Sequence, residues 1–256
     1  MSKIGDLLRK HLNFFVPYST ARDDFKGDRG IFLDANENAL GSVISENWNR
    51  YPDPRQSHLK QVMGKIKGIA PECIFMGNGS DEPIDLLIRA FCEPGIDEVM
   101  IFPPTYGMYK VAANINNVSV NEVLLTQDFQ LDMTQIKSAL NDHVKIIFIC
   151  SPNNPTGNLI QVQDIWDLAT VFKGIIVIDE AYIDFTDTPS WIEVLSNFPH
   201  LVVLQTLSKA WGLASLRLGM AFCHPKIVDI LNLIKPPYNI SGPVQNHVLK
   251  ALKQED

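Results

Sequence analysis

Several signals are missing from this 256-residue sequence. Its four cysteines lie far apart and none forms a C-x-x-C pair, which excludes a disulfide framework and indicates thiols in a reducing compartment. No apolar stretch approaches the ~20 residues of a membrane-spanning helix, and the first residues contain no apolar segment of signal-peptide length. The net charge is -7 without a run of lysine or arginine, so neither nucleic acid nor an anionic membrane is an expected partner. We therefore expect a cytoplasmic protein.

Common nucleotide and metal motifs are missing as well. The sequence has no Gly-x-x-x-x-Gly-Lys-Ser/Thr loop, and no Gly-x-Gly-x-x-Gly follows an expected strand. Its six histidines are scattered, without His-Glu-x-x-His or Cys/His spacing, so no metal site is expected. A nucleotide-binding domain of the Rossmann type is therefore the weakest of the alternatives.

The sequence does contain short apolar runs bounded by Gly, Pro, Asn or Asp, at residues 98–102, 118–124, 145–150, 174–179, 201–207 and 218–223. Most are continuously apolar, as expected of strands that are covered on both faces of a largely parallel sheet. Helical periodicity lies between them, at residues 82–92, 133–139, 163–172 and 191–197. This alternation predicts an α/β sheet with helices on both faces and a ligand site at the carboxyl ends of the strands.

The pattern divides the chain into three parts. Residues 1–30 lack the alternation and are expected to form an N-terminal arm. Residues 31–235 form the large domain. Lys235-Pro236-Pro237-Tyr238 interrupts the pattern, and Gly242-Pro243 opens a last helix within residues 236–256.

Lys209 is the first candidate for chemistry. It follows an apolar run, with Thr206 and Ser208 just before it, and Arg217 lies eight residues further on. A lysine becomes nucleophilic when burial or nearby positive charge lowers its pKa, and an arginine can hold a phosphate through two hydrogen bonds. Taken alone, a surface lysine with a structural arginine is the simpler interpretation.

Asp179 ends the apolar run at residues 174–179, and Tyr182 follows three residues later. A buried carboxylate needs a partner, and a protonated pyridine nitrogen would be one. That pairing would keep the ring cationic and improve it as an electron sink. The alternative is the Asp-Glu pair of a metal or ATPase site, but the phosphate-binding loop that such a site needs is missing.

Three further motifs follow or precede expected elements. Asn154 lies in a Pro- and Asn-rich turn after residues 145–150 and can donate its amide to an oxygen. Gly79, Ser80 and Asp81 lead into a helix whose free N–H groups attract an anion. Tyr106 follows residues 98–102 and offers a ring for stacking. A plain loop, a glycine-rich helix cap and core packing explain them individually.

Together and in this order, these residues resemble fold-type I aminotransferases, which use pyridoxal 5′-phosphate. More narrowly they resemble the histidinol-phosphate aminotransferase family. Further matching segments are Pro17-Tyr18 with Ala21-Arg22, Leu33-Asp34-Ala35-Asn36-Glu37-Asn38, Arg50-Tyr51-Pro52-Asp53 and Leu216-Arg217-Leu218-Gly219. The resemblance implies a mostly parallel seven-stranded sheet with helices on both faces, an N-terminal arm and an incomplete small domain.

The resemblance also implies a role for each matching residue. Lys209 would be the Schiff-base lysine and carry the proton, and Asp179 would bind the ring nitrogen. Asn154 and Tyr182 would bind the phenolic oxygen, and Tyr106 would stack on the ring. The cofactor phosphate would be held by Gly79, Ser80, Asp81, Thr206, Ser208 and Arg217, and by Tyr51 of the neighbouring subunit in a homodimer with shared sites. Tyr18 and Asn36 would face the substrate.

The implied reaction transfers the amino group of L-histidinol phosphate to 2-oxoglutarate, giving imidazole acetol phosphate and glutamate in histidine biosynthesis. Two departures from the family pattern stand out. Ala39 replaces a proline after Asn36-Glu37-Asn38, and the sequence stops at Asp256, before the small-domain segment whose arginine binds the acidic group of the substrate.

Other readings stay open at this point. A threonine-phosphate decarboxylase or an aromatic amino-acid aminotransferase would share the cofactor residues. A truncated fragment that binds cofactor or a partner without turnover is the alternative from a different class. In such a fragment the last helix would expose an apolar face.

Overall fold

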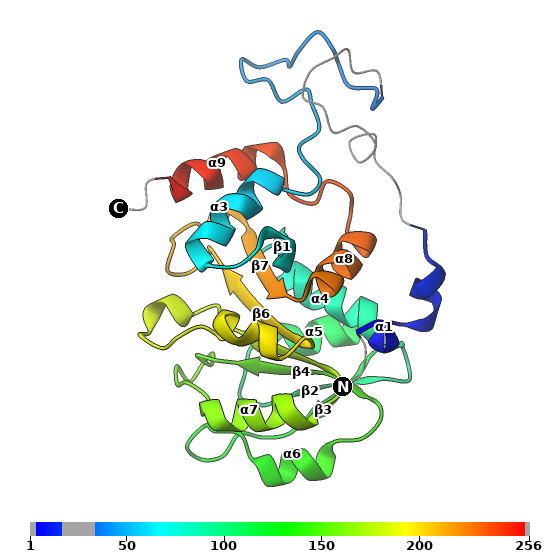
Figure 1. Cartoon of the computed structure of the whole chain (residues 1–256), viewed down its shortest axis with the longest axis vertical. Coiled ribbons are helices and arrows are strands. Elements are labelled where there is room, and N and C mark those ends of the chain that lie inside the picture. Colours follow the sequence, from blue (N-terminus) through cyan, green and yellow to red (C-terminus); the bar gives the residue numbers. More distant parts are fainter. Residues whose placement is uncertain (1–3, 17–33, 254–256) are drawn as a thin grey trace.

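The computed structural model describes residues 4–16 and 34–253, which build one mixed sheet of seven strands (Figure 1). The strands are β1 (Ile74–Asn78), β2 (Glu98–Ile101), β3 (Ser119–Glu122), β4 (Val144–Cys150), β5 (Ile175–Asp179), β6 (Leu201–Thr206) and β7 (Leu218–Cys223). Their spatial order is β1-β7-β6-β5-β4-β2-β3. β7 runs antiparallel to both its neighbours, and the other pairs are parallel. The expected mostly parallel seven-stranded α/β fold is therefore confirmed.

The α-helices are α1 (Ile4–Leu7), α3 (Ser57–Lys67), α4 (Asp81–Phe91), α5 (Met108–Ile115), α6 (Met133–Ala139), α7 (Val162–Val171), α8 (Pro225–Ile234) and α9 (Gly242–Leu252). Short 3₁₀ helices are η1 (Lys10–Phe14), η2 (Pro71–Cys73), η3 (Ile183–Phe185), η4 (Trp191–Asn197) and η5 (Ala214–Leu216). The helix expected at residues 191–197 is thus a 3₁₀ helix. Within the described residues, no helix is long and apolar enough to cross a membrane.

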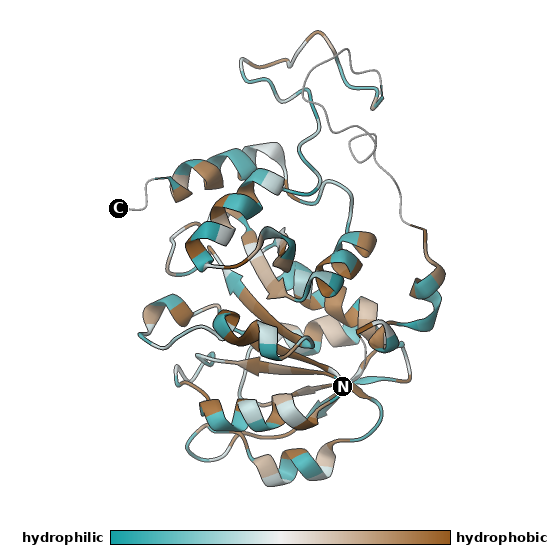
Figure 2. Ribbon diagram, viewed as in Figure 1, coloured by the Kyte–Doolittle hydropathy of each residue, from teal (hydrophilic) through white to brown (hydrophobic). Residues whose placement is uncertain are grey.

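Along every strand except the edge strand β3, alternating side chains enter two separate hydrophobic cores. In β4, Ile146, Phe148 and Cys150 face the core formed with α4, α5 and α8. Ile147 and Ile149 face the opposite core, which includes residues of α3, α6, α7 and α9. Figure 2 accordingly shows mostly hydrophobic residues in the central strands and a mixture of hydrophilic and hydrophobic residues in the helices around them. This double coverage explains why the strands are continuously apolar in sequence.

The last described helix is not the exposed amphipathic element that a truncated fragment would present. α9 packs on α3, and its Val248 and Leu252 are buried in the core (0% and 5% exposed). Gln245 Nε2 donates hydrogen bonds to the carbonyls of Asp53 (3.1 Å) and Ile240 (3.0 Å). The expectation that the last helix exposes an apolar face is therefore wrong for α9, because its apolar face packs against α3.

The reversal of β7 decides which residues meet at one edge of the sheet. β4, β5 and β6 are parallel, so the segments that follow them leave at the same edge. β7 runs the other way and begins where β6 ends, with Thr206 paired to Gly219. Arg217, which precedes a strand, therefore lies beside residues that follow strands.

Candidate active site

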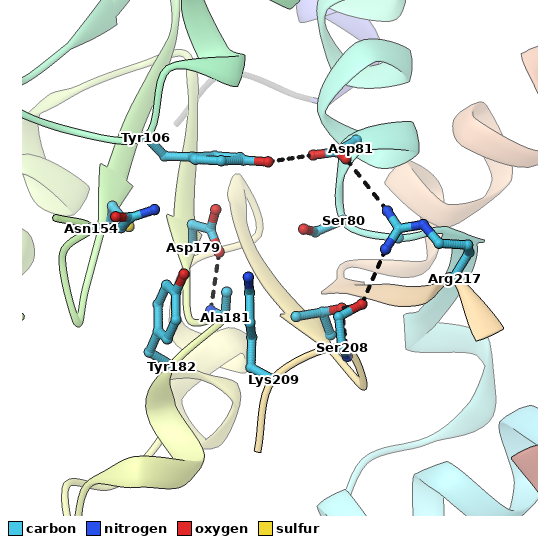
Figure 3. Close-up of a pocket in the computed structure, with 13 residues that line it drawn as sticks. Ser80, Asp81, Tyr106, Asn154, Asp179, Ala181, Tyr182, Ser208, Lys209 and Arg217 are labelled. Atoms are coloured by element: carbon cyan, nitrogen blue, oxygen red, sulfur yellow. Dashed lines mark hydrogen bonds and ion pairs between the residues drawn. The ribbon is translucent and has the colours of Figure 1, made fainter. Parts of the chain in front are cut away.

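One cavity at this edge brings together most of the residues singled out in the sequence (Figure 3). Its walls come from the ends of β1, β4, β5 and β6, from the start of β7 and from the segment after β2. The lining residues are Gly79, Ser80, Asp81, Tyr106, Cys150, Asn154, Asp179, Ala181, Tyr182, Thr206, Ser208, Lys209 and Arg217. Residues separated by more than 130 positions in sequence thus share one space.

Asp179 supplies a buried carboxylate at the end of β5. It is 2% exposed and accepts hydrogen bonds from the Tyr109 hydroxyl (2.7 Å, to Oδ2) and the Ala181 N–H (3.0 Å, to Oδ1). Burial raises the pKa of the Asp179 carboxyl, while the two hydrogen bonds and the charge of Lys209 act in the opposite direction. Among the described residues no cation lies within salt-bridge distance of it, so the carboxylate can serve a positively charged ligand group.

Sequence reasoning missed Tyr109, which holds this carboxylate. Its side chain is fully buried, and its ring stacks on Phe148 at a centroid distance of 4.8 Å. Tyr109 lies in α5, a helix that the sequence analysis did not expect, three residues after Tyr106. Tyr106 precedes the first residue of α5, Met108, so the spacing of the two tyrosines gave no helical signal that could have identified Tyr109.

Lys209 and Tyr182 lie next to each other in the cavity (Figure 3). The Lys209 Nζ lies 5.4 Å from the centre of the Tyr182 ring, and in Figure 3 the amine points into the space between Tyr182 and Ser208. The loop after Lys209 is held from outside, because Trp211 Nε1 donates to Asp184 Oδ2 at 2.9 Å. Asp184 Oδ1 also accepts from Lys67 Nζ at 3.2 Å. Asp184 therefore links the segments that carry Lys209 and Tyr182.

The opposite end of the cavity gathers groups suited to an anion. Arg217 Nη1 lies 3.4 Å from Ser208 Oγ, and its Nη2 lies 3.7 Å from Asp81 Oδ2. Thr206 Oγ1 is 3.0 Å from Ser208 Oγ and accepts the Ser208 N–H at 3.1 Å. Helix α4 begins at Asp81, so the free N–H groups of its first turn lie at this end of the cavity.

An aromatic ring and an amide complete the walls. The Tyr106 hydroxyl donates to Asp81 Oδ1 at 3.1 Å, and burial raises the pKa of Tyr106 well above its ordinary value. Asn154 lies across the cavity from the anion-binding end (Figure 3). The cavity thus offers an amine, a carboxylate, an amide, a flat ring and an anion site around one space.

Two predicted residues, Tyr51 and Asn36, lie outside this cavity. Tyr51 and Asn36 line a second cavity, with Arg50 and Tyr238. The Tyr51 ring stacks on Tyr238 at 4.4 Å and is 51% exposed. Tyr18 belongs to a part of the chain outside the described residues.

Comparisons with known proteins agree on one family. Residues 24–256 match the model for aminotransferase class I and II. Histidinol-phosphate aminotransferase of Cytophaga hutchinsonii is 54% identical over 250 residues, which are 98% of this chain and 72% of that protein. A crystal structure of the histidinol-phosphate aminotransferase from Clostridium acetobutylicum superposes with a TM-score of 0.73 and 27% identity, over 81% of this chain and 62% of that one.

A third match adds a cofactor-bound example of the fold. It is the crystal structure of histidinol-phosphate aminotransferase from Sinorhizobium meliloti in complex with pyridoxal-5′-phosphate, with a TM-score of 0.76 and 22% identity. The match covers 87% of this chain and 64% of that one. The chain therefore spans between 62% and 72% of the length of these relatives.

Proposed function

Because the chain belongs to the class I and II aminotransferases, and within them to the histidinol-phosphate aminotransferases, we propose that it transfers the amino group of L-histidinol phosphate to 2-oxoglutarate with pyridoxal 5′-phosphate as cofactor. The products are imidazole acetol phosphate and glutamate, as a step of histidine biosynthesis. One observation carries the proposal: a lysine amine, a buried carboxylate without a cation and an arginine beside a helix start line the same cavity.

The chemistry of the cavity suits this cofactor. A buried carboxylate is costly without a positive partner, and Asp179 has only neutral hydrogen-bond donors, so a protonated ring nitrogen would complete its surroundings. Arg217, Ser208 and the first turn of α4 provide the charge and hydrogen bonds that a phosphate takes. Gly79, Ser80, Asp81 (through backbone N–H groups) and Thr206 would contribute to the same anchoring.

The remaining residues would orient the ring and move the proton. Tyr106 would stack on the ring, while Asn154 and Tyr182 would donate hydrogen bonds to its phenolic oxygen. When bound, pyridoxal phosphate supplies an aldehyde that bonds to amines and a ring that stabilises negative charge at the substrate Cα. Lys209 Nζ would hold the cofactor aldehyde covalently until the substrate amine displaces it. The freed amine would then take up the Cα proton and deliver it to the cofactor carbon that came from the aldehyde.

The proposal extends to a homodimer and to the residues that would face the substrate. Tyr51, which lies in the second cavity, would reach the cofactor phosphate of a second copy of the chain in a cytoplasmic homodimer. Asn36 lines the same cavity and would face the substrate together with Tyr18. The Tyr51 ring is half-exposed and lines no part of its own chain's Lys209 cavity, which supports contact with another subunit.

The decisive experiment incubates the purified protein, pyridoxal phosphate, histidinol phosphate and 2-oxoglutarate and measures glutamate. Glutamate formation without carbon dioxide is expected. Carbon dioxide released from threonine phosphate would favour the decarboxylase, and glutamate formed only from aromatic amino acids would favour the aromatic aminotransferase. Cofactor binding without any product would support a fragment that does not turn over.

The Lys209→Ala variant tests the assignment of the lysine. We expect it to lose the absorbance band of covalently bound cofactor and about 10²–10⁴-fold of the rate, because general base catalysis is worth about that much. Lys110→Ala is the matched control, since Lys110 pairs with Glu122 at the surface (2.6 Å) and lines no part of the cavity. Retention of the band in Lys209→Ala would overturn the assignment.

A further inference from the structure

The contact between Tyr109 and Asp179 joins two buried groups on different elements. Tyr109 is 0% exposed in α5, and its hydroxyl donates to Asp179 Oδ2 at 2.7 Å. The Ala181 N–H donates to the other oxygen, Oδ1, at 3.0 Å. Each carboxylate oxygen therefore has one donor on the protein side and keeps a further lone pair for a ligand.

We propose that Tyr109 is a positioning residue for Asp179, whose carboxylate it keeps ionised and oriented toward the ring nitrogen of the cofactor. The inference rests on the proposed function, because it assigns Asp179 to that nitrogen. Tyr109 itself lines no part of the cavity and acts only through the carboxylate.

Packing alone does not account for a tyrosine at this position. The ring lies parallel to Phe148 (8° between planes) and edge-on to Tyr106 (5.5 Å, 85°), and a phenylalanine ring would make both contacts. The hydroxyl adds a polar atom to the core, which is costly unless it is hydrogen-bonded. Its charge-assisted bond to a carboxylate repays that cost more fully than a bond to a neutral acceptor would.

The surroundings of Asp179 explain why a donor is needed. Burial favours the neutral acid and raises its pKa, and the negative charge of Asp81 acts in the same direction. Lys209, the Ala181 N–H and the Tyr109 hydroxyl favour the ionised form. The titratable and charged groups that face the carboxyl are Tyr109 of α5, Cys150 of β4, Asp81 of α4, Tyr106 after β2 and Lys209 after β6.

Tyr109→Phe tests the proposal because it removes the hydroxyl and keeps the ring. In the apoprotein, the Asp179 carboxyl is followed by infrared or ¹³C NMR titration and assigned with Asp179→Asn. We expect the Asp179 pKa to be higher in Tyr109→Phe than in the wild type. We also expect pyridoxal phosphate affinity to fall about tenfold below the Asp179 pKa measured in the variant, as loss of one hydrogen bond to a charged group implies, and to recover above it.

Two comparisons separate this role from a structural one. Phe148→Leu weakens the packing around Tyr109 but keeps its hydroxyl, so thermal stability should fall while the Asp179 pKa stays near the wild-type value. Tyr238→Phe removes a tyrosine hydroxyl at the second cavity and should leave the Asp179 pKa unchanged. An unchanged Asp179 pKa in Tyr109→Phe, or an affinity loss of equal size below and above that measured pKa, would overturn the proposal.

The design also distinguishes this inference from the proposed function. If the wild-type chain bound no pyridoxal phosphate, the proposed function would fail. The titration of the apoprotein would still decide whether the Tyr109 hydroxyl keeps Asp179 ionised, because it needs no cofactor.

Discussion

Arg217 lies against the backbone of Gly79 so closely that a β-carbon on Gly79 would be 2.6 Å from the arginine Nη2. Gly79 also has a φ of +69°, a backbone conformation that residues other than glycine adopt only with strain. The backbone joins the same pair, because the Gly79 N–H donates to the Arg217 carbonyl at 2.8 Å. The absence of a side chain at Gly79 therefore sets where the arginine head group lies.

Replacing Gly79 by alanine should weaken cofactor binding more than stability alone explains. The strain of a positive φ costs about 1–2 kcal/mol, and the displaced guanidinium should lower pyridoxal phosphate affinity by about tenfold or more. Gly68→Ala is the matched control, because Gly68 has a φ of +66° with no atom within 4 Å of its added β-carbon. Thermal unfolding and cofactor titration of both variants check this. Equal affinity loss in both would contradict the role of the Arg217 contact.

Asp179→Asn should stabilise the apoprotein at neutral pH while it weakens cofactor binding. Burial raises the pKa of Asp179 above its unfolded value, so the folded state binds the proton more tightly. The stability from this group is then fully present below the unfolded pKa and is lost as the pH rises through the folded pKa. The melting temperature of Asp179→Asn should exceed that of the wild-type apoprotein at pH 8, and the two should converge toward pH 4. A lower melting temperature at pH 8 would contradict this.

Trp211→Phe should slow turnover with little effect on folding. The variant loses the 2.9 Å hydrogen bond from Trp211 to Asp184, which is worth about 0.5–1.5 kcal/mol, so the loop of Lys209 should be less well fixed and kcat should fall about two- to tenfold. Asp184→Asn retains an acceptor for Trp211 and loses the charge that pairs with Lys67. If kcat changes in Asp184→Asn and not in Trp211→Phe, the ion pair rather than the indole fixes the loop.

Mixing two inactive variants tests the shared site of the proposed homodimer. If Tyr51 acts across the interface, Lys209→Ala impairs the site of its own subunit, whereas Tyr51→Phe impairs the site of the other subunit. A hybrid dimer then contains one site with both wild-type residues, so equal mixing after subunit exchange should restore about a quarter of the wild-type activity. No recovery, with hybrids detected by native mass spectrometry, would mean that Tyr51 does not act across the interface.

The strands of the sheet centre were predictable because burial on both faces leaves continuous apolar runs. Residues 218–223 coincide with β7 and residues 174–179 differ from β5 by one position. β1 was not predicted, since Gly77 and Asn78 interrupt its apolar stretch. Helix α5 has only eight residues, too few for clear periodicity.

The site followed a similar rule. Residues that end strands, such as Asp179, or follow them, such as Asn154 and Lys209, could be inferred from the sequence to share an edge, and they line one cavity. Tyr109 could not, because its role depends on which way an eight-residue helix faces and how close it packs to β5. The placement of Tyr51 in a different cavity from Lys209 is likewise a property of packing rather than of spacing.

Because β7 returns beside β6, Lys209 and Arg217 belong to a single antiparallel hairpin. With Lys209 and Arg217 as the proposed covalent and ionic attachment points of the cofactor, the distance between them depends on the loop at residues 207–217. Two backbone hydrogen bonds hold the conformation of this loop. The Leu207 N–H donates to the Leu218 carbonyl (3.0 Å), and the Leu213 N–H donates to the Leu207 carbonyl (2.9 Å). Inserting or deleting one residue in this loop would change the distance between Lys209 and Arg217, which has to match the distance from the aldehyde to the phosphate of the cofactor. Substitutions that keep the number of loop residues would not change it.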